Sequence, residues 1–197
     1  MNTKKKFIVA LSSLGIVTVG VLVSLVAVLA AFTTNSLSGF QVSYTAVNVQ
    51  AKISGTYALN GATAETITAN EGAAQFIEFG YADNDASGVA TKNFDEITGL
   101  ALAKENGSVV LHYTIENTAT DGSTFAVDVT QNGTPTNLKV EYSTDNADWS
   151  ENITAIETAS VAKGTPHEVY VKITIVNNTQ NASWENAGLS FQLTIND

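Results

Sequence analysis

Residues 109–129 read VVLHYTIENTATDGSTFAVDV, two runs of alternating residues around an Asp-Gly turn signal at 121–122. Every second side chain is apolar in residues 109–115, and the same period returns in residues 125–129. A period of two is the pattern of a β-strand with one buried face. This stretch therefore predicts two β-strands that line a core and are joined by a polar turn.

The same period recurs before and after this stretch. Apolar alternation predicts further strands within residues 42–53, 76–79, 138–142, 169–175 and 189–195, and Asn-Gly or Lys-Gly turn signals lie between several of them. Seven or eight strands in about 165 residues predict an all-β fold, an antiparallel β-sandwich of jelly-roll or immunoglobulin-like type. Residues 82–105 alternate poorly, so we expect there a long loop or a short helix around Phe94–Ala103.

The first predicted strand segment changes phase in its middle. Val42 and Tyr44 form one apolar face, whereas Val47, Val49 and Ile53 form the other. Because a slip of one residue exchanges the two faces of a strand, the shift predicts a bulge or a bend. The segment, which carries no charge up to Gln50, has two interpretations: it is the first strand of its own domain, or it is donated to the open edge of a neighbouring copy. Head-to-tail donation would lead to self-association into filaments.

The chain begins with an export signal. Lys4–Lys6 precede the 26 residues Phe7–Phe32, which contain no charge, proline or amide. As a helix this run would be about 39 Å long, which exceeds a hydrocarbon core of about 30 Å. The lysines hold the N-terminus in the cytoplasm. We therefore expect residues 1–32 to be a signal peptide or signal anchor and residues 33–197 to be an extracellular β-sandwich domain.

Two fates of the apolar run remain open. A signal peptidase cuts at the small residues Ala30 and Ala31 or next to Phe32, or the run stays as a transmembrane helix that holds the protein at the cell surface.

The charge and cysteine content of the chain exclude several classes of binding partner and of chemistry. After residue 31 the chain has six lysines, no arginine and nineteen acidic residues, so its formal net charge is −13. Such a surface repels nucleic acid and anionic lipid headgroups, and neither is expected as a partner. The chain contains no cysteine, which excludes disulfides and thiol chemistry. An exported protein without cysteine is typical of Gram-positive bacteria, and we expect a bacterial source.

No catalytic motif is present. The sequence contains neither His-Glu-x-x-His nor Gly-x-Ser-x-Gly. His112 alternates with apolar neighbours and is predicted to face solvent, and His167 follows Pro166 in a predicted turn. We therefore expect no enzyme; a hydrolase would need carboxylates that converge in a pocket with shifted pKa values.

One segment resembles the start of a calcium loop. Asp83, Asp85 and Ser87 supply oxygen atoms at loop positions 1, 3 and 5, and Gly88 stands at position 6. The twelfth position is Phe94, where a bidentate glutamate is needed. The segment is either a weak calcium site or an ordinary polar turn.

Three aromatic residues are candidates for glycan binding. Trp149 and Trp184 lie in polar surroundings, and together with Tyr142 they could form a surface on which sugar rings stack. The alternative is that each tryptophan closes an end of the domain, with its indole N–H hydrogen-bonded at the rim.

The residues around the end of the apolar run, AAFTTN at 30–35, resemble the processing junction of the TasA/camelysin-type family of exported biofilm-matrix proteins. Residues 110–129 resemble the family's strand–turn–strand pattern, and residues 169–195 resemble its closing hairpin. The Gly-Gly-Thr that usually precedes the junction is missing, and Asn35 replaces an acidic residue. The resemblance implies cleavage by a dedicated signal peptidase and a jelly-roll subunit that polymerises into fibres by its N-terminal strand.

Together these observations predict a non-enzymatic structural protein of the cell surface or extracellular matrix. The alternative is an extracellular carbohydrate-binding or other ligand-binding module.

Overall fold

A computed structural model describes residues 34–45, 49–80, 83, 88–101, 107–133, 138–176 and 189–196. The chain divides into two compact units, Met1–Thr33 and Thr34–Asp197, and every described residue belongs to the second. The described part is all-β, with thirteen strands and one short 3-10 helix, η1 (Ile153–Ile156). Within these residues no helix is long and apolar enough to span a membrane.

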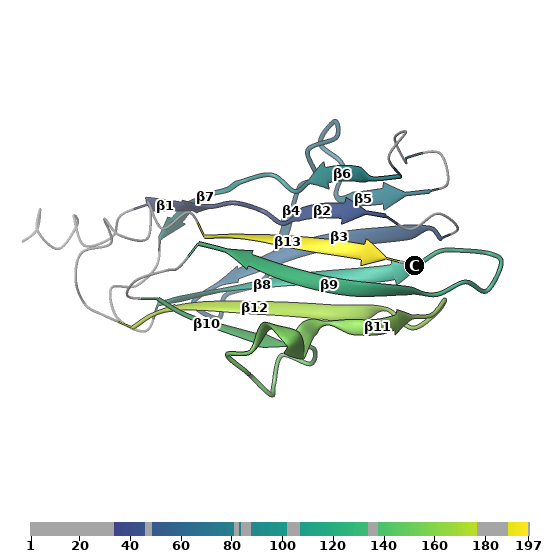
Figure 1. Cartoon of the computed structure of the whole chain (residues 1–197). Coiled ribbons are helices and arrows are strands. Elements are labelled where there is room, and N and C mark those ends of the chain that lie inside the picture. Colours follow the sequence, from purple (N-terminus) through teal and green to yellow (C-terminus); the bar gives the residue numbers. More distant parts are fainter. Residues whose placement is uncertain are drawn as a thin grey trace, which may run out of the picture. The chain divides into compact units, whose positions relative to one another are not determined.

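The strands form two large sheets and one small one (Figure 1). The six-stranded sheet has the order β10 (Leu138–Ser143), β12 (His167–Ile175), β8 (Ser108–Asn117), β3 (Ala51–Leu59) and β4 (Glu65–Ile67), and β5 (Phe76–Phe79) also pairs with β3. The five-stranded sheet has the order β11 (Thr158–Val161), β9 (Phe125–Asn132), β13 (Ser190–Asn196), β2 (Gln41–Tyr44) and β6 (Ala90–Asn93). The small sheet pairs β1 (Thr34–Leu37) with β7 (Ile97–Ala101). All described pairs are antiparallel except β2 with β13.

Both large sheets contribute to one hydrophobic core. The alternation predicted for β8 is confirmed, because Val109, Leu111, Tyr113 and Ile115 are fully buried. The two strands of residues 109–129 belong to different sheets, so their polar turn carries the chain from one sheet to the other. Asn117, which is buried, fixes this crossing: its side-chain N–H groups donate to the carbonyl oxygens of Ser123 at 2.8 Å and Val161 at 2.9 Å.

The phase shift in the first strand segment is a change of sheet. Val42 and Tyr44 belong to β2 in the five-stranded sheet, whereas Ile53 belongs to β3 in the six-stranded sheet. All three and Val49 are buried, so each half of the segment faces the common core from its own sheet. Val47 lies outside the described residues.

The expectation of a loop or a helix around Phe94–Ala103 is wrong for the described residues, because β6 covers residues 90–93 and β7 covers residues 97–101. The strands β1, β4 and β11 were not predicted either. Each of these five strands has only three to five residues, and β6 has no fully buried side chain, so the sequence pattern carries no period to detect.

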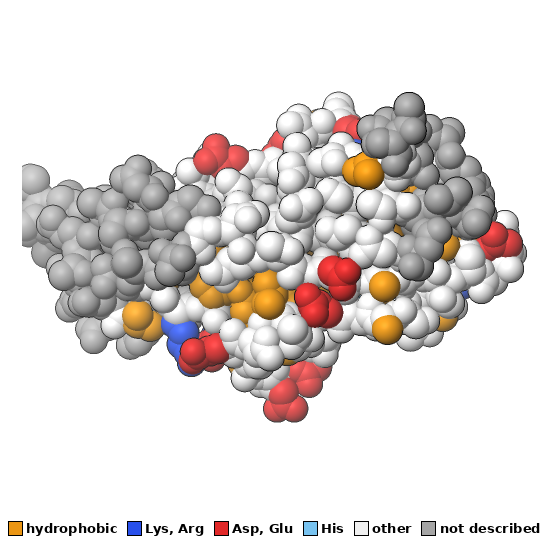
Figure 2. Space-filling model, in the orientation of Figure 1, with side chains coloured by type: hydrophobic (Ala, Val, Ile, Leu, Met, Phe, Trp, Pro, Cys, Tyr) orange, Lys and Arg blue, Asp and Glu red, His pale blue; other side chains and the backbone are white. Residues whose placement is uncertain are grey.

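The outer faces of the two large sheets differ in charge. The six-stranded sheet carries Lys172, Glu168 and Glu141 on half-buried positions that alternate with core residues. The corresponding positions of β13 and β2 carry uncharged side chains such as Gln192 and Ser43. Figure 2 shows mostly uncharged atoms over β13, β2 and β6.

Candidate assembly site

The N-terminal strand, residues 34–44, lies in a slot formed by two other parts of the chain. On one side it pairs with residues 90–101 in an antiparallel ladder, from Thr34 opposite Ala101 to Tyr44 opposite Ala90. The N–H of Phe94 donates to the carbonyl oxygen of Phe40 at 3.0 Å, which continues this ladder between β1 and β2. On the other side, β2 runs parallel to the C-terminal strand β13.

Phe40 is the anchor of this strand. Its ring is fully buried and lies 4.1 Å from the ring of Tyr113 and 5.0 Å from the ring of Phe191, measured between centroids. Its backbone N–H donates to the phenolic oxygen of Tyr113 at 3.2 Å. Tyr113 belongs to β8 and Phe191 to β13, so one residue ties the N-terminal strand to both large sheets.

Burial raises the pKa of the Tyr113 phenol far above its ordinary value. The hydroxyl therefore stays neutral at physiological pH and remains an acceptor for the Phe40 N–H group.

Two glycines make room for this anchor. A Cβ atom on Gly39 would lie 2.5 Å from the carbonyl oxygen of Asp95 and 2.8 Å from the Cβ of Phe94. A Cβ atom on Gly55 would lie 2.8 Å from the ring of Tyr113. The strand thus approaches the chain at residues 94–95 too closely for any side chain at position 39.

Only some of the residues predicted for strand donation lie in this slot. Val42 and Tyr44 belong to the N-terminal strand, and the Tyr44 ring stacks on Phe79 at 4.9 Å. Val49 and Ile53 follow the change of sheet and lie outside the slot. The sequence did not indicate Leu37 and Phe40, which are buried in the same strand.

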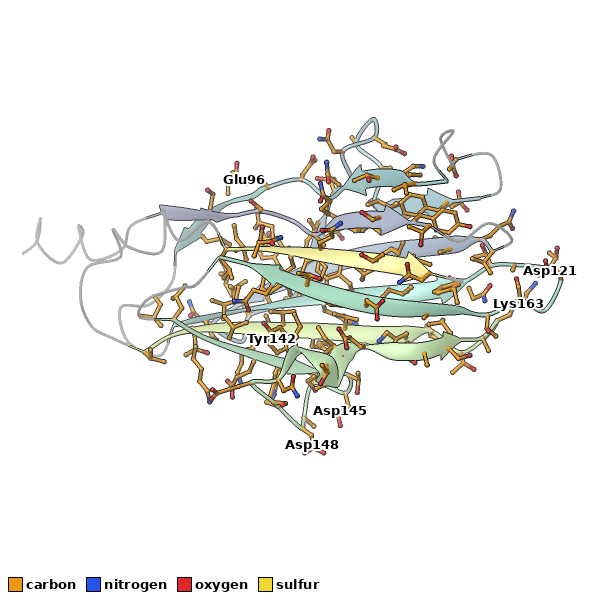
Figure 3. The ribbon with its side chains drawn as sticks, in the orientation of Figure 1. Glu96, Asp121, Tyr142, Asp145, Asp148 and Lys163 are labelled. Carbon is orange, nitrogen blue, oxygen red and sulfur yellow. The ribbon has the colours of Figure 1, made fainter. Side chains whose placement is uncertain are left out.

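Of the three residues predicted to stack on sugars, Tyr142 is buried. Tyr142 belongs to β10 and is 3% exposed (Figure 3), and its hydroxyl donates to the side-chain oxygen of Gln131 on β9. Burial raises the pKa of Tyr142 to about 12. Trp149 is half-buried, with the ammonium of Lys172 above its ring at 4.2 Å. Trp184 lies outside the described residues.

Only part of the predicted calcium segment is described. One carboxylate oxygen of Asp83 accepts a hydrogen bond from the N–H of Gly80 at 2.6 Å, and the other lies 3.8 Å from the ammonium of Lys92. Asp85 and Ser87 lie outside the described residues. Among the residues that the structure describes, no three His, Asp or Glu side chains gather closely enough to bind a metal ion.

A polar cluster on the outer face of the six-stranded sheet was not predicted. His112 stacks on Tyr170 with ring centroids 4.0 Å apart, and its Nε2 lies 2.6 Å from a carboxylate oxygen of Glu168. Thr114 donates to the same oxygen at 2.8 Å. His112 thus lies on the outer face as predicted, but its ring is half covered by neighbours.

This cluster differs from a catalytic triad. In a triad one ring nitrogen contacts the carboxylate and the other contacts the nucleophile. Here the Nε2 of His112 is the atom that lies near both Glu168 and Thr114, the latter at 3.4 Å. The second histidine, His167, begins β12 instead of lying in a turn, and its Nε2 lies 2.8 Å from the carbonyl oxygen of Ile156.

Among the described residues, the carboxyl groups of Glu141 and Asp145 both have pKa values below the ordinary value. Hydrogen bonding from Lys139 lowers the pKa of Glu141, and the backbone N–H groups of Ala147 and Asp148 lower that of Asp145. A general acid at neutral pH needs a raised carboxyl pKa. These two groups are therefore suited to ion pairing and turn formation.

The processing residues Ala30, Ala31 and Phe32 lie outside the described residues. The chain matches no protein-family model, no curated protein and no solved structure.

Proposed function

We propose that this protein is an exported, non-enzymatic structural subunit of the cell surface or extracellular matrix, whose copies join by exchanging their N-terminal strands. In this proposal the two large sheets form a β-sandwich of jelly-roll type. The observation that carries the proposal is the slot: residues 34–44, which directly follow the expected export signal, lie between β6/β7 and β13.

An empty slot would be unfavourable. Leu37, Phe40, Val42 and Tyr44 are all at most 3% exposed. At roughly 1.5–3 kcal/mol for each buried side chain, their removal would forfeit on the order of 6–12 kcal/mol, as an upper estimate. The edges of β6 and β13 would also lose their backbone partners. The slot therefore requires a strand, either from its own chain or from a neighbour.

The same contacts are available from a neighbouring copy. An identical strand offers the same side chains and backbone groups. The equilibrium between a strand in the slot of its own chain and a strand in the slot of a neighbour therefore depends on protein concentration and on the linker. The six residues 45–50 connect β2 to β3, and fully extended they span about 20 Å. Residues 33–50 carry no charge that would oppose pairing between copies. A neighbour whose slot lies within that reach would accept the strand, and repetition would give a filament.

Electron microscopy of the mature chain tests this proposal. Residues 33–197 should form filaments, whereas a variant that lacks residues 33–46 should remain a less stable monomer. A synthetic peptide of residues 33–46 should bind that variant and restore its melting temperature, which separates loss of the strand from general misfolding. A mature chain that stays monomeric at high concentration from pH 4 to pH 8 would contradict strand exchange.

Mass spectrometry of the exported protein tests its processing. Cleavage should fall between Leu29 and Thr33. Recovery of the intact chain Met1–Asp197 from membranes alone would instead establish a surface protein that keeps its N-terminal anchor.

A further inference from the structure

A hollow of about 310 Å³ lies where β13 and the N-terminal strand separate. Pairing between these strands begins at Gln192 and Gln41. Ser190, two residues before Gln192, and Ser38, three residues before Gln41, line the hollow. Asn93 and Asn132 complete its polar wall. The volume is at the lower end of the range for small-molecule sites.

The amides of the hollow form a row across the sheet. Gln192, Gln41 and Asn93 are register partners on three adjacent strands, so they follow one another at about 4.8 Å. Their side chains lie on the outer face, because the next residues along β13 and β2, Leu193 and Val42, are buried in the core.

Most side-chain amides that line the hollow make no hydrogen bond to another described residue. The side-chain amide of Gln192 donates to the hydroxyl of Ser43 at 2.9 Å, which holds it in place and leaves its oxygen as an acceptor. The side-chain amides of Gln41, Asn93 and Asn132 make no hydrogen bond to another described residue. Each can donate and accept at once.

The amide and hydroxyl groups that line the hollow indicate the class of ligand that it can bind. Hydroxyl groups of a sugar also donate and accept, so they match a row of amides and serine hydroxyls. None of the described residues that line the hollow is a lysine, and Glu96 at its rim, labelled in Figure 3, disfavours an anion. The net charge of −13 on the exported part acts in the same direction. We propose that this hollow binds a sugar residue of a neutral glycan.

The site requires a seated N-terminal strand. Ser38, Gly39 and Gln41 supply one wall, whichever copy provides them. Glycan binding is therefore independent of whether the strand is exchanged. It also does not involve Trp149, which lies near Lys172 of the six-stranded sheet.

Isothermal titration of the folded mature chain with neutral oligosaccharides of glucose, mannose and N-acetylglucosamine tests the site, with oligogalacturonate as the anionic comparison. The double variant Gln41→Ala/Asn93→Ala should weaken binding at least about tenfold, since it removes two hydrogen-bonding groups. Thr91→Ala, on the same strand as Asn93 but outside the hollow, should leave binding unchanged.

A second variant distinguishes loss of the glycan site from damage to the strand slot. Asn132→Ala alters β9 only, and it should also weaken binding while the urea midpoint stays that of the parent. The proposal is overturned if no neutral oligosaccharide binds, if oligogalacturonate binds more tightly, or if Trp149→Ala abolishes binding while the amide variants do not.

Discussion

Replacing Gly39 by alanine adds one methyl group where the N-terminal strand passes closest to residues 94–95. The new Cβ atom would lie 2.5 Å from the carbonyl oxygen of Asp95, about 0.9 Å short of the 3.4 Å at which ordinary contact begins. That oxygen is a backbone atom, so it cannot rotate away, and the strand must move together with the buried ring of Phe40. Overpacking of this kind costs about 1–3 kcal/mol.

Alanine also restricts the unfolded chain, which returns about 0.4–1 kcal/mol. We therefore expect a net loss of about 1–2 kcal/mol in the free energy of unfolding, or a melting temperature lower by roughly 3–8 °C for a domain of this size. Hydrogen exchange should accelerate in β1 and β2 first, because the strand leaves its slot more often. Ser38→Ala, at an exposed neighbouring position, is the matched control and should behave like the parent. Unchanged stability and unchanged exchange in Gly39→Ala would refute the close approach of the two chain segments.

Three further predictions concern other parts of the domain. Asn117→Ala should lower the free energy of unfolding by about 3 kcal/mol in urea titrations, because it removes three hydrogen bonds, of which those to the carbonyl of Val161 and from the N–H of Ala119 are buried and that to the carbonyl of Ser123 is partly buried; a loss below about 1 kcal/mol would contradict its role at the sheet crossing. Burial raises the pKa values of Tyr113 and Tyr142, so the unfolded chain ionises first: these two phenols should leave stability unchanged below about pH 10, and above it stability should fall by about 1.4 kcal/mol per pH unit for each tyrosine. Tyr142→Phe should make that fall shallower, and an unchanged slope would count against a buried phenol. Millimolar calcium should leave the melting temperature unchanged, because the ammonium of Lys92 already lies near the carboxylate of Asp83, whereas a rise specific to calcium would establish a binding loop.

The long strands could be predicted from the sequence because each turns one continuous face to the core. β8 and β12 show this most plainly, with a buried residue at every second position over nine or ten residues. The phase shift within residues 42–53 was a real signal as well. Its cause, a change of sheet, could not be separated from a bulge, because both exchange the buried face.

The slot could not be predicted for two physical reasons. Leu37 and Phe40 are buried three positions apart, because residues 38–40 between β1 and β2 are not regular strand, and an odd spacing breaks the period of two. The partner of the strand, residues 90–101, lies 46 to 67 positions further along the chain and is too weakly patterned to be recognised as strand. Tyr142 is a different case, because the sequence supported two predictions for it. Its alternation with Leu138 and Val140 indicated a side chain that faces the core, whereas its aromatic ring suggested an exposed sugar-binding residue. The structure agrees with the alternation.

Because the chain contains no cysteine, engineered cysteines can report directly where the N-terminal strand lies. Ser43 and Thr91 are register partners on β2 and β6, at a separation that suits a disulfide. We would place Ser43→Cys in one chain and Thr91→Cys in another, assemble the mixture and oxidise it, with Ser108→Cys and Thr174→Cys on the paired strands β8 and β12 as the control. Strand exchange predicts disulfide-linked dimers that contain both chains of the first pair and none of the second. Absence of the mixed dimer, together with an internal disulfide in the Ser43→Cys/Thr91→Cys double variant, would show that each chain keeps its own strand.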